Sequence, residues 1–236
     1  MIDPASVPSS TVDWTGAHRI VRSLHPPIDF FEDIADPADW PLLIAVAMKT
    51  DPQFIETLGA LDLVAPGRRV SGPGATYLMA PFTHVSEDRP NRFSRGDYGV
   101  LYAARAFDTA LLETMYHHAR FMARTNEPPG WTSQFRELVL NVSARLHDLR
   151  GGEAGFEAAL DPEDYGESQR LAASLRGTGS DGIAFPSVRH PGGYCVGLFC
   201  PDLATKPVPG SDLDYHWNGN RIDFYRDVGI GAVYRV

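Results

Sequence analysis

From residue 76 onward, strand-like and helix-like segments follow one another, and no internal repeat or low-complexity tract interrupts them. The expected elements in chain order are a strand at 101–103, a helix at 109–124 capped by Asp108, one or two strands at 135–149, a helix at 168–176, and strand and turn material at 182–199 and 229–236. This mixed order predicts an α+β fold built around a bent β-sheet.

The N-terminal part of the chain differs in composition and in its expected secondary structure. Residues 1–18 are polar and contain two prolines, so we expect an unstructured or docked tail. Residues 18–22 have the pattern of a short strand. Residues 29–65 contain two Asp-Pro pairs, each suited to a helix start, with an apolar run between them. We therefore expect a helical insert at 29–65 within a single domain that spans residues 1–236.

Composition and charge exclude several classes of protein. The chain has 236 residues, of which 43% are hydrophobic, enough to bury a large core. No apolar run reaches the roughly 20 residues of a membrane span, and no signal-peptide pattern is present, so we expect a soluble, cytoplasmic protein. The net charge of −9 argues against broad binding of nucleic acids or acidic membranes. Cys195 and Cys200 are expected to pack rather than to form a disulfide.

An arginine, a tyrosine and a glutamate lie within about two expected elements of one another: Arg92, Tyr102 and Glu113. An arginine can hold a phosphate with its planar fork, and a tyrosine can stack on a flat group. A carboxylate can bind ribose hydroxyls and stabilise an oxocarbenium-like transition state. These groups suit cleavage of an N-glycosidic bond in a nucleotide. The helix alone, with Glu113 spaced for pairing with His117 and Arg120, is better explained as a solvated face with ordinary ion pairs.

A second polar group follows the apolar run that begins at residue 182. Pro186 is expected at a strand edge or end, and period-two spacing puts Ser187 and Arg189 on one face of it. Alone, this pattern indicates a polar strand edge without chemistry. Ser187 lacks the Gly-x-Ser-x-Gly elbow of a nucleophile, so we expect it to hydrogen-bond ribose, nicotinamide or phosphate.

The chain resembles the RES domain, the toxin half of a bacterial toxin–antitoxin pair, in four ordered motifs: Arg92-Phe93-Ser94, Tyr102 in Leu-Tyr-Ala, Glu113 in Ala-Leu-Leu-Glu, and Ser187 in Asp-Gly-Ile-Ala-Phe-Pro-Ser-Val-Arg. The resemblance covers the region of Arg19 and then residues 76–200. It implies an ADP-ribosyltransferase-like fold with a split β-sheet and flanking helices, in which residues 76–236 form the catalytic core. It also implies an activity that consumes NAD+ as a substrate.

The resemblance carries site residues over by motif. Arg92, Tyr102, Glu113 and Ser187 match the key positions of the family, and His117, four residues after the glutamate, matches another polar position that lines the pocket and is expected to bind the substrate. Arg189 is expected beside Arg92 at the pyrophosphate. One departure is Ser94, which stands where many members have asparagine; it keeps a hydrogen-bonding group but has a shorter reach.

The same resemblance implies partners and a reaction. The length and the N-terminal insert look more like the ParT-type members, which implies transfer of ADP-ribose to a protein acceptor such as an enzyme of nucleotide biosynthesis. Hydrolysis or phosphorolysis of NAD+ is the alternative outcome. A cognate antitoxin is expected to cover the cleft, and neither a membrane nor a nucleic acid is expected as a direct partner.

Two interpretations from other classes stay open at this point. The chain could be a non-catalytic binding module that uses the polar helix stripe and the insert as a partner surface. It could also be a metal-dependent hydrolase that uses His117. Because His117 and His118 are adjacent and no His-Glu-x-x-His pattern accompanies them, we expect no metal site.

Overall fold

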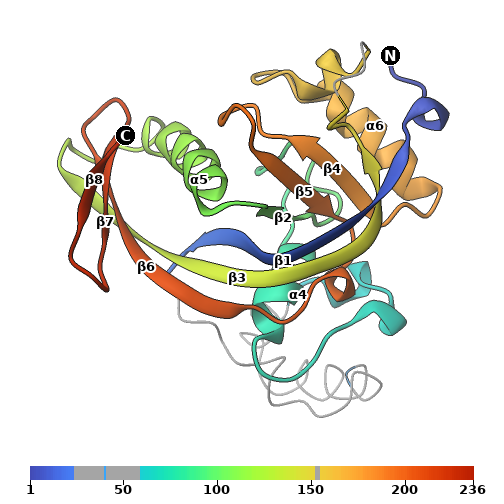
Figure 1. The fold of residues 1–236 in the computed structure, drawn as a ribbon, viewed down its shortest axis with the longest axis horizontal. Helices are drawn as coiled ribbons and strands as arrows, with labels where there is room; N and C mark the ends of the chain where they lie inside the picture. Colours follow the sequence, from blue (N-terminus) through green and yellow to red (C-terminus); the bar gives the residue numbers. More distant parts are fainter. Residues whose placement is uncertain (24–39, 41–58, 152–154) are drawn as a thin grey trace.

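The computed structural model describes residues 1–23, 40, 59–151 and 155–236 (Figure 1). Its strands are β1 (Ser9–Arg22), β2 (Leu101–Ala104), β3 (Trp131–Asp148), β4 (Gly182–Pro186), β5 (Tyr194–Leu198), β6 (Val208–Trp217), β7 (Ile222–Asp227) and β8 (Val233–Arg235). Its α-helices are α4 (Ala75–Thr83), α5 (Phe107–Met122) and α6 (Gly166–Gly177). Short 3-10 turns are η1 (Pro4–Ser6), η2 (Leu61–Leu63), η3 (Pro66–Arg68), η4 (Glu157–Leu160) and η5 (Pro201–Leu203). The predicted α+β class is confirmed. The helical insert predicted at 29–65 lies mostly outside the described residues.

All eight strands belong to one sheet with the order β1-β2-β5-β4-β3-β6-β7-β8. The 18-residue strand β3 joins its parts: its first half pairs with β6, most of its length pairs with β1, and its end pairs in parallel with β4. Because β1 also meets β2, through the single pair His18 and Ala104, five strands close into a ring. The remaining strands β6, β7 and β8 extend from β3 as a curved arm (Figure 1).

The prediction of a tail over residues 1–18 is wrong, because β1 begins at Ser9 and pairs with β3 along most of its length. Polar and apolar residues alternate here, and Val12 and Trp14 are buried while their neighbours are exposed. The alternation shifts by one residue at Gly16, where φ is 73° and the register with β3 slips. The short strand predicted at 18–22 is the second half of β1.

Helices cover both faces of the sheet and enclose two hydrophobic cores. Figure 1 shows α5 and α6 on one side of the long strands and α4 on the other. Met115 of α5 and Leu171 of α6 belong to the first core, whereas Leu78 and Met79 of α4 belong to the second. Cys195 is buried in the first core and forms no disulfide. The two layers hold the ends of β2 and β4 against α5, which is where the candidate site lies.

Helix α5 starts differently from the prediction. Its N-cap is Ala106, which provides no side-chain cap, and Asp108 lies within the first turn, where its charge favours the helix dipole. The buried stripe comprises Thr109, Ala110, Leu111, Met115, His118 and Met122. Glu113 therefore lies beside this stripe, at the border between the core and the surface.

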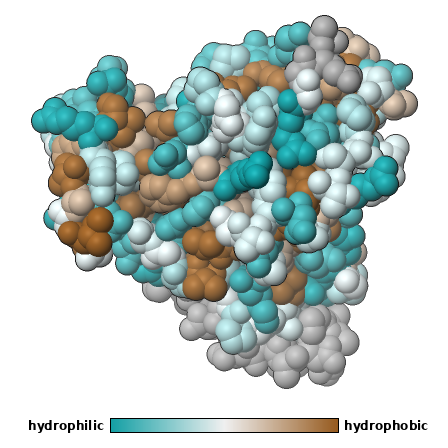
Figure 2. All heavy atoms as spheres, in the orientation of Figure 1, coloured by the Kyte–Doolittle hydropathy of each residue, from teal (hydrophilic) through white to brown (hydrophobic). Residues whose placement is uncertain are grey.

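The arm of the sheet carries exposed apolar side chains. Figure 2 shows hydrophobic residues at the surface around β7 and β8, and the exposed large ones in this region are Val228, Ile230, Val233, Tyr234 and Val236. Since β8 is last in the strand order, it also has a free backbone edge. None of the helices in the described part of the chain is long and apolar enough to cross a membrane.

Candidate functional site

Glu113 and Ser187, 74 residues apart in sequence, are joined by a hydrogen bond. The Ser187 hydroxyl donates to Glu113 Oε1 at 2.6 Å. The same hydroxyl accepts the backbone N–H groups of Arg189 at 3.2 Å and His190 at 3.0 Å. With one donor and two acceptor positions used, the hydroxyl has one orientation, and Ser187 is only 8% exposed. Ser187 therefore fixes the direction of the Glu113 carboxylate.

The local fold explains why Ser187 reaches α5. Strand β4 ends at Pro186, and Ser187 starts a turn closed by a hydrogen bond from its own N–H to Gly193 O at 2.8 Å. The prediction that Ser187 and Arg189 share one face of a strand is wrong, because both lie in this turn. The turn redirects the chain toward α5.

The Asn91–Ser94 loop holds the Tyr102 hydroxyl. This hydroxyl donates to Asn91 Oδ1 at 2.7 Å and accepts the Phe93 N–H at 3.0 Å. The rings of Phe93 and Tyr102 stack with centroids 6.0 Å apart. Burial raises the pKa of Tyr102 far above its ordinary value, so the hydroxyl stays protonated. Tyr102 thus anchors the loop that carries Arg92.

The Ser94 side chain points into its own loop. Its side chain is fully buried, and its hydroxyl donates to Tyr98 O at 2.6 Å and accepts the Gly96 N–H at 2.9 Å. These bonds close the loop after Arg92. In this geometry Ser94 shapes the backbone and does not reach a ligand.

Arg92 is buried against the segment that precedes α6. Its side chain is 7% exposed, and its Nη1 donates to Ala159 O at 3.1 Å and to Asp161 O at 3.0 Å. Its guanidinium lies 4.7 Å from the centroid of the Tyr165 ring. The 159–165 segment therefore covers the arginine that the sequence assigns to a phosphate.

Two side chains of helix α6 donate hydrogen bonds to the backbone of the Arg92 loop. Ser168 Oγ donates to Arg92 O at 2.7 Å, and Gln169 Nε2 donates to Asn91 O at 2.8 Å. Sequence reasoning missed Ser168, Gln169 and Asn91. Asn91 stands next to Arg92 in the motif and could have been found there, whereas nothing in the sequence marks the two α6 residues.

Arg189 is held by the same segment and by α5. Its guanidinium carbon lies 3.4 Å from the centroid of the Tyr116 ring, its Nη2 donates to Pro162 O, and it is 3.5 Å from Glu163 Oε1. Its Nε is buried with no hydrogen-bond partner among the described residues. Arg189 therefore retains an unused donor.

His117 lies one turn after Glu113 on α5, with its Nε2 3.9 Å from Glu113 Oε2. Desolvation lowers its pKa below the ordinary value of 6.5, and three arginine charges act in the same direction: Arg189, Arg92 and Arg120. The Glu113 charge opposes them. Although 55% of the His117 side chain is exposed, the lowered pKa leaves it mostly neutral near pH 7.

Cys195 is a buried free cysteine whose thiol the Glu113 and Arg92 charges influence. Burial raises the pKa of its thiol far above the ordinary value, with the Glu113 charge acting in the same direction and the Arg92 charge against it. The thiol is therefore protonated and does not qualify as a nucleophile. Among the described residues, no group of three or more His, Cys, Asp or Glu side chains could hold a metal ion.

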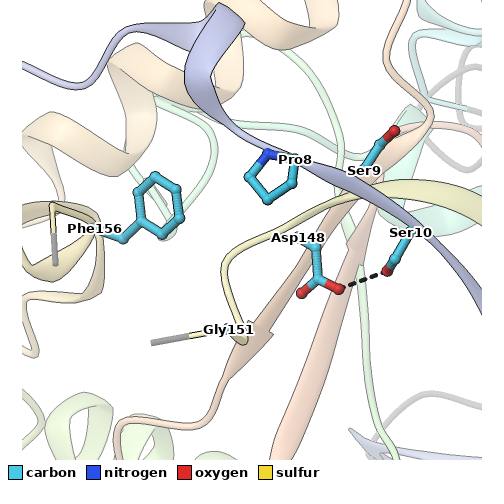
Figure 3. Close-up of a pocket in the computed structure, with 6 residues that line it drawn as sticks. All are labelled: Pro8, Ser9, Ser10, Asp148, Gly151 and Phe156. Atoms are coloured by element: carbon cyan, nitrogen blue, oxygen red, sulfur yellow. Dashed lines mark hydrogen bonds between the residues drawn. The ribbon is translucent and has the colours of Figure 1, made fainter. Parts of the chain in front are cut away.

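Two cavities lie away from these residues. One of about 120 Å³ is lined by Pro8, Ser9, Ser10, Asp148, Gly151 and Phe156; Figure 3 shows the Ser10 hydroxyl bonded to Asp148 at its wall. The other, of about 320 Å³, lies between η3 and the end of α6 and includes Arg68, Arg176 and Cys200. Neither is lined by Arg92, Glu113 or Ser187. At the candidate site, the 159–165 segment lies against both arginines.

Comparison with known proteins identifies the family. No curated protein matches the sequence. A solved structure of the M. tuberculosis MbcT–MbcA toxin–antitoxin complex is similar, with 11% identity, 87% coverage of each chain and a TM-score of 0.45. The RES domain family model matches residues 66–218, which is more than half of the chain and includes Arg92, Tyr102, Glu113 and Ser187. The chain therefore belongs to the RES domain family.

Proposed function

We propose that this protein is the toxin of a toxin–antitoxin pair and that it cleaves the bond between nicotinamide and ribose in NAD+. One observation carries the proposal: the Glu113 carboxylate is held by Ser187 on one oxygen, while its other oxygen faces His117. A fixed carboxylate beside a mostly neutral histidine suits the stabilisation of positive charge. Membership of the RES domain family supports this proposal.

The proposed chemistry follows from the charge that develops on the sugar. As nicotinamide leaves, the ribose acquires oxocarbenium character, and the Glu113 carboxylate stabilises it. Ser187 acts as a positioning residue for Glu113. Arg92 and Arg189 supply positive charge for the pyrophosphate, and the Tyr102 ring lines the nicotinamide side. Ser94 is left out of the substrate contacts because its hydroxyl is buried in its own loop.

The test of cleavage is nicotinamide release by the purified protein. Glu113→Gln keeps the shape of the side chain and can still accept from Ser187, but it lacks the charge. We expect kcat to fall by roughly 100- to 1000-fold, the usual effect of removing one preorganised electrostatic contact. Glu87→Gln, at an exposed glutamate of the loop after α4, is the matched control. Wild-type nicotinamide release by the Glu113 variant would remove Glu113 from this role.

For the acceptor, we propose a protein, in line with the ParT-type resemblance, and an enzyme of nucleotide biosynthesis as its class. Incubation of the protein with labelled NAD+ and cell lysate separates the outcomes. Label on a protein band supports transfer. Free ADP-ribose indicates hydrolysis, and a phosphorylated ADP-ribose product indicates phosphorolysis; either one as the sole product contradicts transfer.

We further propose that the toxin acts in the cytoplasm and is neutralised by a cognate antitoxin that covers the Glu113 region. Expression of the chain alone should arrest growth and lower cellular NAD+. Expression of the Glu113→Gln variant should do neither. If both forms arrest growth equally, toxicity does not depend on the proposed chemistry.

A further inference from the structure

Three donors converge on the Glu163 carboxylate outside the Glu113–Ser187 pair. The Tyr116 hydroxyl donates to Oε1 at 2.5 Å, Arg120 Nη1 donates to Oε2 at 3.2 Å, and Arg189 Nη2 is 3.5 Å from Oε1. The Tyr116 hydroxyl bond holds the pKa of Glu163 below its ordinary value, and the two arginine charges act in the same direction. The group bound here is therefore an anion.

The donors form a scaffold of their own. Tyr116 and Arg120 are one turn apart on α5, and Arg120 Nη1 also donates to the Tyr116 hydroxyl at 3.3 Å. The Arg189 guanidinium stacks 3.4 Å from the centre of the Tyr116 ring, and only 14% of its side chain is exposed. Two contacts therefore link these side chains without involving Glu163.

Glu163, in contrast, is held only weakly by these donors. Its side chain is 64% exposed, and exposed ion pairs contribute little to stability. It stands in a tight turn in which Asp161 Oδ1 accepts the N–H groups of Glu163 and Asp164, both at 2.7 Å. An anion with more charge and more acceptor oxygens, such as a phosphoryl group, can compete with a single carboxylate for these donors.

The donor cluster lies next to the proposed reaction centre. Tyr116 and Arg120 follow Glu113 by three and seven positions, so the three side chains lie along one face of α5. The charges of Arg120 and Arg189 reach His117, which is next to Glu113. A phosphoryl group bound by the cluster would therefore lie along the same face of α5 as a ribose at Glu113.

We propose that Tyr116, Arg120 and Arg189 form a phosphoryl-binding subsite, and that the Glu163 carboxylate occupies it when no nucleotide is bound. This inference rests on the proposed function only where it assigns the phosphoryl group to NAD+. The Glu163 carboxylate then competes with the phosphoryl group of a nucleotide for the same three donors, and the nucleotide must displace it. Binding of phosphate by the cluster itself is independent of any reaction.

The test is titration calorimetry of the full chain with ADP, and with adenosine as the ligand without phosphate. Glu163→Gln should bind ADP about 3- to 10-fold more tightly, since the carboxylate charge that competes for these donors is removed. Arg120→Gln should bind ADP about 3- to 10-fold more weakly. Adenosine affinity should be unchanged in both variants. The matched controls are Glu87→Gln and Arg124→Gln, the latter one turn beyond Arg120 and exposed.

The outcomes separate this inference from the proposed function. If neither Glu163→Gln nor Arg120→Gln changes the ADP affinity, or if both shift adenosine equally, the subsite does not exist, whatever the activity. If ADP binding follows the expected pattern while wild-type protein releases no nicotinamide from NAD+, the subsite stands and the proposed function fails. Circular dichroism of each variant checks that a loss of binding is not a loss of folding.

Discussion

Removal of the Ser187 hydroxyl should weaken both the fold and the proposed reaction. Ser187→Ala deletes a 2.6 Å bond to a carboxylate, and hydrogen bonds to charged groups contribute about 1.5–3 kcal/mol. Because 21% of the Glu113 side chain is exposed, water replaces part of this bond, which leaves about 2 kcal/mol. The N–H groups of Arg189 and His190 also lose their acceptor, at 3.2 and 3.0 Å, and we add about 1 kcal/mol for the pair.

The expected loss in free energy of unfolding is therefore about 3 kcal/mol, or roughly 6–12 °C in Tm for a chain of this size. Urea unfolding followed by circular dichroism measures it, with Ser143→Ala on the exposed side of β3 as the control. Nicotinamide release should also fall by roughly 10- to 100-fold in kcat, because a displaced carboxylate stabilises the sugar charge less well.

A double-mutant cycle isolates the bond itself. In Glu113→Gln the amide oxygen can still accept from Ser187, so the coupling energy reports the charged part of the interaction, which we expect to be about 1 kcal/mol. If Ser187→Ala is as stable as Ser143→Ala and the cycle shows no coupling, Ser187 does not hold Glu113 in solution. The reasoning that makes Ser187 a positioning residue would then be refuted.

Two further predictions concern the surroundings of the site. Tyr102→Phe keeps the stacked ring but loses the hydrogen bonds to Asn91 and Phe93. The free energy of unfolding should therefore fall by about 1–2 kcal/mol, and the KM for NAD+ should rise. An unchanged KM would mean that the loop does not depend on this hydroxyl. Burial lowers the pKa of His118 from 6.5 to about 4, so stability should fall as pH drops from 6.5 toward 4, where the unfolded chain takes up a proton that the folded chain does not. His118→Phe should reduce the stability difference between pH 7.5 and 4.5 by about 2 kcal/mol in urea titrations, and an undiminished difference would contradict the assignment.

The sequence predicted helices and strands better where apolar residues recur at a regular spacing than where they do not. Helices α5 and α6 and strand β2 lie close to their predicted bounds. The first half of β1 was missed because its polar residues and nearby prolines were interpreted as a tail, although Val12 and Trp14 are both buried. Its pairing with β3 is a long-range contact, and local composition does not record such a contact.

At the candidate site, side-chain chemistry was predictable and its partners were not. Arg92, Glu113 and Ser187 stand out by residue type and motif, but the turn after Pro186 that brings Ser187 to Glu113 depends on how β4 ends against α5. Arg92 donates to main-chain carbonyls at Ala159 and Asp161, and every residue type offers such a carbonyl. Contacts of this kind leave no mark in the sequence.

The closure of the strand ring has a mechanical consequence. Strands β2, β5 and β4 are joined to one another by four and five residue pairs, but this block meets β1 through one pair and β3 through two. At the seam with β1, Arg19 adds one bond from its side chain to the Tyr102 carbonyl at 2.9 Å. Main-chain pairing therefore joins this block to the long strands at only three residue pairs, and the packing of the two hydrophobic cores holds the rest of it in place.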